Sequence, residues 1–151
     1  MGKIEELQHQ CSHVPEKALT TQTQTRPATP YERLGGRDVL RRIVDRFYDL
    51  MDADPTYAEL RAMHAEDLTP MRESLTGFLT GWSGGPRDWF DANPGRCMMS
   101  IHKPYTIGAD VAGQWSQAMG RAISDEIGGQ DPEIAKAMTE VLDQLARGMV
   151  R

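Results

Sequence analysis

Residues 37–51 read RDVLRRIVDRFYDLM, and this stretch decides the fold class. Its apolar side chains recur every three or four residues and share one wide face: Val39, Leu40, Ile43, Val44, Phe47, Tyr48 and Met51. A repeat near 3.6 residues is the period of an α-helix that turns one side toward a core. The stretch therefore predicts a long helix whose apolar face must be covered by other helices.

The same period returns in three later segments, at 69–82, 109–127 and 132–149. Glycine or proline stands at the boundaries of these segments, where helices commonly begin or end. Shorter helical turns are predicted near 31–34 and 57–60. Because no segment of the sequence alternates with a period of two, we expect an all-α fold with four long helices.

The N-terminal residues differ from the rest in composition. The run from Thr20 to Pro30 is rich in Gln, Thr and Pro and has no repeating apolar face. Such a composition cannot bury enough apolar surface to fold. We therefore expect residues 1–29 to form a flexible extension and residues 30–151 to form one domain.

The overall composition excludes several classes of protein. The net charge of −5 opposes binding to nucleic-acid phosphates. The sequence has no run of about 18 apolar residues to span a bilayer, and residues 1–20 lack the apolar segment of a secretory signal. We expect a cytoplasmic protein, monomeric or homodimeric, that binds neither nucleic acid nor a membrane.

Four polar aromatic side chains stand where the pattern predicts the interior or its edge. Tyr48 and Trp115 lie on apolar helix faces, while His64 and His102 lie at the ends of elements. A buried polar group without a partner costs about 1–3 kcal/mol. The helical period alone is explained if these four side chains form hydrogen bonds with backbone carbonyls. The alternative is that they share a polar ligand.

Five motifs follow one another in a set order: Tyr31-Glu32-Arg33-Leu34-Gly35-Gly36, Arg46-Phe47-Tyr48, Trp82-Ser83-Gly84-Gly85-Pro86, His102-Lys103-Pro104-Tyr105-Thr106-Ile107 and Gln114-Trp115. Over about residues 30–151, this pattern resembles the second group of the truncated haemoglobins. The resemblance implies a shortened globin fold, which is a two-over-two helical sandwich around haem b (iron protoporphyrin IX).

The resemblance also implies roles for single residues. His102 matches the proximal histidine, whose neutral imidazole binds haem iron and leaves the opposite axial position open. Tyr48, His64 and Trp115 match the distal side, where each side chain can donate a hydrogen bond to dioxygen. The apolar walls of the haem pocket would consist of Phe47, Met71, Leu75, Phe78, Leu79, Met99, Tyr105, Ile107 and Met119.

The sequence departs from the family pattern at two positions. Many relatives carry Arg directly before the proximal histidine, where it reaches a haem propionate, but this chain has Ile101. The remaining candidates for the propionates are Arg72, Arg96 and Lys103. Met71 stands where relatives often have a small residue near the distal entrance, so we expect a narrower route for the ligand.

Three functions are compatible with these residues. The first is reversible binding of dioxygen and other diatomic gases, used for redox removal of nitric oxide or peroxide, or for sensing. Turnover would need an external reductase, because the sequence contains no flavin or nicotinamide motif, and whether the protein is an enzyme stays open. The alternatives are a haem-free interaction or regulatory module, and an electron-transfer protein with His64 as the second iron ligand.

Overall fold

The computed structural model describes residues 28–96, 102 and 105–150. In chain order, its elements are α2 (Pro30–Leu34), α3 (Arg37–Ala53), the 3₁₀ turn η2 (Pro55–Tyr57), α4 (Ala58–Ala62), α5 (Thr69–Trp82), α6 (Asp88–Ala92), α8 (Ala109–Ile127) and α9 (Pro132–Gly148). In these ranges there is no strand, and one isolated bridge joins Ile107 to Val150. The predicted all-α class is confirmed.

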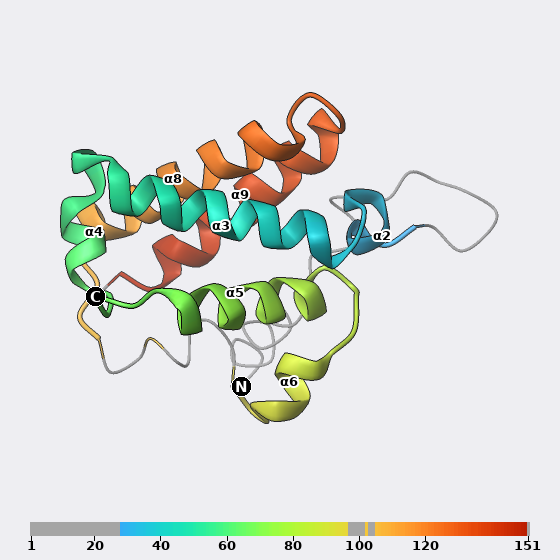
Figure 1. Cartoon of the computed structure of the whole chain (residues 1–151), viewed down its shortest axis with the longest axis horizontal. Helices are drawn as coiled ribbons and strands as arrows, with labels where there is room; N and C mark the ends of the chain where they lie inside the picture. Colours follow the sequence, from blue (N-terminus) through green and yellow to red (C-terminus); the bar gives the residue numbers. More distant parts are fainter. Residues whose placement is uncertain (1–27, 97–101, 103–104, 151) are drawn as a thin grey trace.

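The long helices form two pairs. Helix α3 runs beside α5, and α8 runs beside α9, with α3 also packed on α8. Figure 1 shows α3 and α5 lying alongside each other, with α3 passing in front of α8 and α9. This arrangement is the two-over-two sandwich that the sequence predicts. The proposed extension, residues 1–29, lies outside the described residues except for residues 28 and 29.

The core lies where the two pairs meet. Phe47, Phe78, Met119 and Met138 come from the four long helices, and none is more than 1% exposed. Burying a side chain of this size contributes about 1.5–3 kcal/mol. The apolar helix faces that the sequence predicts therefore hold the sandwich together. Among the described residues, no helix is long and apolar enough to cross a membrane.

Local chemistry sets the ends of the helices. Thr29 and Glu32 form a reciprocal capping box at the start of α2, and the Asp131 side chain accepts a hydrogen bond from Ile134 N–H at the start of α9. Arg33 of α2 pairs with Asp131 at 3.0 Å. Helix α2 is thus tied to the start of α9, at the far end of the chain.

Helix α6 lies close to α5 because α5 presents glycine to it. A Cβ atom added at Gly81 would lie 2.6 Å from the Phe90 ring, and one added at Gly77 would lie 3.1 Å from Trp89. The Trp89 indole also donates a 3.1 Å hydrogen bond to Ser74 Oγ. These contacts fix the start of the connection that leads from α6 to His102.

Candidate functional site

A cleft opens between α3, α5, α8 and the residues His102, Tyr105 and Ile107. Its volume is about 200 Å³, and it opens to solvent on one side. Its lining consists of Tyr48, Leu60, Met63, His64, Met71, Ser74, Leu75, His102, Tyr105, Ile107, Val111, Ala112, Trp115, Ala146 and Met149.

The mouth of the cleft is unusually apolar. Four large apolar side chains of the described residues are exposed: Met63 (41%), Met71 (37%), Tyr105 (54%) and Val150 (39%). The first three line the cleft, and Val150 bridges to Ile107, which also lines it. Exposed apolar surface gathered in one place is typical of a binding site. The cleft therefore suits a ligand with apolar faces.

Tyr48 lies in the wall that α3 contributes. Its side chain is 5% exposed, and its ring meets the Phe47 ring edge to face, with the centroids 4.9 Å apart. Burial raises the pKa of Tyr48 to about 12, although the charge of Arg72 acts in the opposite direction. The hydroxyl is thus protonated at neutral pH, and it has no hydrogen-bond partner within the described part of the chain.

Trp115 occupies the neighbouring wall, on α8. Its ring also contacts Phe47, with the centroids 5.4 Å apart. Next to it, Gln114 Oε1 accepts a 3.1 Å hydrogen bond from Leu60 N–H, which holds α8 against α4. The Trp115 indole N–H makes no hydrogen bond to any described residue, so it is available to a ligand in the cleft.

His64 presents an acceptor rather than a donor. Its Nδ1 lies 2.8 Å from the Leu60 carbonyl oxygen. Since a carbonyl oxygen can only accept, Nδ1 carries the proton of the neutral ring and Nε2 carries a lone pair. Burial lowers the pKa of His64, which favours this neutral form. The expectation that His64 donates to a ligand therefore holds only for the protonated ring.

His102 lies on the same cleft, in the connection between α6 and α8. Its carbonyl oxygen accepts a 3.0 Å hydrogen bond from Tyr105 N–H, and the two rings are 6.2 Å apart. The side chain is half-buried. Tyr48 and His64 contact each other, with ring centroids 6.0 Å apart. The cleft thus brings together all four polar aromatic residues that the sequence singled out.

The residues predicted to form apolar walls divide into two sets. Met71, Leu75, Tyr105 and Ile107 line the cleft. The others that the structure describes are buried in the core and do not line it: Phe47, Phe78, Leu79 and Met119. Phe47 backs the cleft through its contacts with Tyr48 and Trp115. Met99 lies outside the described residues.

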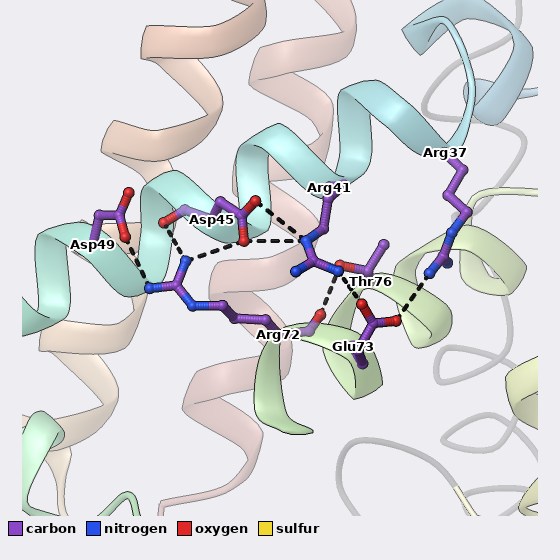
Figure 2. Close-up of polar contacts among 7 residues, drawn as sticks. All are labelled: Arg37, Arg41, Asp45, Asp49, Arg72, Glu73 and Thr76. Atoms are coloured by element: carbon purple, nitrogen blue, oxygen red, sulfur yellow. Dashed lines mark hydrogen bonds and ion pairs between the residues drawn. The ribbon is translucent and has the colours of Figure 1, made fainter. Parts of the chain in front are cut away.

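The three cations proposed for the propionates are less favourable. The guanidinium of Arg72 is bound by Asp45 at 3.0 Å and Asp49 at 2.8 Å, both on α3 (Figure 2). It is therefore engaged with protein carboxylates, and the expectation that it serves a propionate does not fit this geometry. Arg96 is exposed, and Lys103 lies outside the described residues.

The sequence interpretation missed several residues of the lining. Met63, Ser74, Val111, Ala112, Ala146 and Met149 all border the cleft. Val111 had a signal, because it precedes Trp115 by one helical turn and so shares its face. Ala146 and Met149 had none, since only tertiary packing brings the end of α9 to the cleft.

The donor set of the cleft fits haem better than a metal held by protein alone. Within residues 28–96, 102 and 105–150, no three His, Cys, Asp or Glu side chains come together as a metal site. A protein-bound zinc ion would need three or four such ligands. Two imidazoles, apolar walls and two donors without described partners suit a macrocycle that brings its own nitrogen ligands to the metal.

Known proteins give the same answer. The family model described as bacterial-like globin matches residues 29–151. The Group 2 truncated hemoglobin YjbI of Bacillus subtilis (strain 168) is 30% identical over 121 residues, which are 80% of this chain and 87% of that protein.

Two solved structures share the fold. The cold-adapted truncated hemoglobin of Pseudoalteromonas haloplanktis TAC125 has a TM-score of 0.78 and 32% identity, covering 82% of this chain and 98% of its own. The group II 2-on-2 hemoglobin of Agrobacterium tumefaciens has a TM-score of 0.78 and 27% identity, covering 87% and 98%. The chain therefore belongs to the bacterial-like globin family, as a group II truncated haemoglobin whose family cofactor is haem.

Proposed function

We propose that this globin holds haem b in the cleft and reversibly binds dioxygen and other diatomic ligands there. One observation carries the proposal: Tyr48 and Trp115 each offer an unpartnered donor, among the described residues, to the same cleft that His102 lines. Two donors without described partners that border one cleft favour a polar ligand there, since a hydrogen bond to such a ligand contributes about 0.5–1.5 kcal/mol.

His102 is the residue that would bind the iron. When bound, haem would supply an iron atom that can bind a diatomic ligand. A neutral imidazole is the usual protein ligand for such iron. The apolar side chains of Met71, Leu75 and Ile107 would lie against the macrocycle and exclude water from the ligand.

Tyr48 and Trp115 would stabilise the bound ligand. Tyr48 stays protonated at neutral pH because burial raises its pKa to about 12, and the indole N–H of Trp115 does not titrate. Both rings rest on the buried Phe47, which limits their movement. Neutral His64 adds no third donor through Nε2. Two fixed donors should slow ligand release.

Slow release favours holding or transforming the ligand over carrying it. We therefore propose sensing, or redox removal of nitric oxide or peroxide, ahead of oxygen transport. Such turnover would draw electrons from an external reductase, since the sequence carries no flavin or nicotinamide motif. A spectrum of the reduced protein in air, with and without a reductase, would distinguish stable binding from turnover.

One experiment tests the proposal as a whole. The purified protein is titrated with haem, reduced, and exposed to oxygen and then to vacuum. We expect a Soret band that saturates at one haem per chain and shifts reversibly with oxygen. A protein that takes up no haem would instead be a haem-free globin-like module.

A second function has a specific observation in its favour. His64 Nε2 carries a lone pair and borders the same cleft as His102, so both residues could ligate one iron atom. The protein would then transfer electrons, or bind gases only after His64 leaves. A six-coordinate spectrum in the absence of added ligand would support this alternative, and a five-coordinate spectrum would exclude it.

A further inference from the structure

Arg72 joins α5 to α3 beside Tyr48. Its Nη1 donates to the Asp45 carbonyl at 3.1 Å and to Asp45 Oδ1 at 3.0 Å, and its Nη2 donates to Asp49 Oδ1 at 2.8 Å. The guanidinium carbon lies 5.7 Å from the centroid of the Tyr48 ring. Figure 2 shows the Arg72 side chain reaching from α5 to the two carboxylates on α3.

These contacts fix the guanidinium in position. Asp45 and Asp49 are one helical turn apart on α3, and Tyr48 lies between them in the sequence. A planar guanidinium held by three hydrogen bonds has little freedom to rotate. The Arg72 side chain is 20% exposed, so solvent screens its charge only in part. The cation is thus held at a set distance from the Tyr48 ring.

We propose that Arg72 is a positioning residue for Tyr48. Arg72 holds the Tyr48 ring in place and strengthens the hydrogen bond that the Tyr48 hydroxyl donates in the cleft. This inference rests on the proposed function. A cation close to an aromatic ring attracts its π electrons. Electron density is thereby drawn from the phenol oxygen, and its O–H becomes a better donor. Arg72 also follows Met71, so the same bonds hold that part of the cleft wall.

Arg41 provides a matched control within the same network. It bonds Asp45 on α3 at 3.1 Å and Glu73 on α5, and therefore joins the same two helices (Figure 2). No contact of Arg41 with Tyr48 occurs among the described residues. Loss of Arg41 should affect the packing of the helices without affecting the phenol.

The test compares R72M, R72K, R41M, Y48F and the double variant R72M/Y48F, all loaded with haem. The infrared C–O stretch of bound carbon monoxide reports the donor strength, oxygen release is timed by stopped flow, and the melting temperature is measured on the haem-free proteins. We expect R72M to move the C–O stretch toward the Y48F value and to speed oxygen release about two- to fivefold, the effect of a weak cation–π contact. R72K keeps the positive charge, so its C–O stretch and its rate of oxygen release should lie between those of R72M and wild type.

The controls separate positioning from packing. R41M should lower the melting temperature to a similar extent as R72M but leave the C–O stretch at its wild-type position. In the Y48F background, R72M should change neither the stretch nor oxygen release. A stretch shifted equally by R41M and R72M, or an undiminished R72M effect without the hydroxyl, would overturn the inference.

Failure of the inference differs from failure of the proposed function. If Y48F shifts the stretch and R72M does not, Tyr48 is a donor and Arg72 only joins the helices, so the inference alone is wrong. If Y48F leaves both the stretch and oxygen release unchanged, Tyr48 is no donor to the ligand, and the proposed role and the inference are both wrong.

Discussion

The two walls of the cleft are built differently. Tyr48 and Trp115 lie on long helices whose other faces form the core, and Phe47 supports both rings. His102 lies in the connection between α6 and α8, where Tyr105 N–H donates a hydrogen bond to the His102 carbonyl oxygen and Ile107 bridges to Val150. The comparison teaches that a core side chain directly supports Tyr48 and Trp115, whereas His102 lies in a connection between helices.

Among the predicted changes, removal of the His102 side chain should have the largest effect, which is on haem retention. In His102→Ala, we expect haem retention to fall by more than the roughly 10–100-fold that loss of an outer partner costs at metal sites. The rate of haem transfer to an excess of another apoglobin, followed at the Soret band, measures it. His64→Ala is the control and should retain haem. If His102→Ala keeps the wild-type spectrum and retains haem as wild type does, another residue binds the iron.

Substitutions of Tyr48 and Trp115 should change the release of oxygen without changing the retention of haem. Tyr48→Phe and Trp115→Phe should each speed oxygen release about tenfold, which corresponds to the loss of about 1.4 kcal/mol of hydrogen bonding. Stopped-flow displacement of oxygen by carbon monoxide measures the rate. Tyr57→Phe is the control, because Tyr57 is buried and does not line the cleft. Unchanged release in both variants would mean that these donors point away from the ligand.

The mouth of the cleft offers a smaller effect. Met71 is 37% exposed and lines the cleft, so Met71→Ala should widen the entrance. We expect carbon monoxide to associate faster by less than about tenfold, the lower end of the spread among variants of one site. Flash photolysis measures this rate, and oxygen release should not change. Wild-type association kinetics would show that ligands enter by another route.

The smallest expected effect is the pH dependence that His64 contributes. Burial lowers its pKa below the ordinary value of 6.5, so the unfolded chain takes up a proton at a higher pH than the folded chain. The stability that neutral His64 contributes is complete above pH 6.5 and is lost as the pH falls through the lower folded pKa.

Urea unfolding of the haem-free protein at a series of pH values measures this dependence. Between about pH 7 and about pH 5, wild type should lose more stability than His64→Phe, whose side chain does not titrate in this range. Parallel pH profiles for the two proteins would mean that the His64 pKa is not lowered by folding.

Much of the fold could be predicted because helix formation follows a local period. The stretch 37–51 predicted a helix that the structure extends to Arg37–Ala53, and the segments 69–82 and 109–127 match α5 and α8. Within the apolar faces, however, the period did not separate core from cleft. Phe47 is fully buried and the adjacent Tyr48 lines the cleft, since both lie on one wide stripe.

Three half-buried members of the predicted apolar faces line the cleft. Val111, Trp115 and Met149 lie on helical stripes that read as core, yet the structure leaves them partly exposed and on the cleft lining. An apolar cofactor selects the same residue types as a protein core. The sequence pattern therefore cannot tell a wall for haem from a wall for another helix.

The sequence by itself determined the helices, their order and the residues that identify the family, because these depend on local periods and short motifs. Only the tertiary structure decided which partners the polar side chains take. Arg72 pairs with Asp45, which is 27 positions away, and the proton on His64 Nδ1 follows from the Leu60 carbonyl. A period reports that a side chain is buried. It does not report which neighbour the folded chain brings to it.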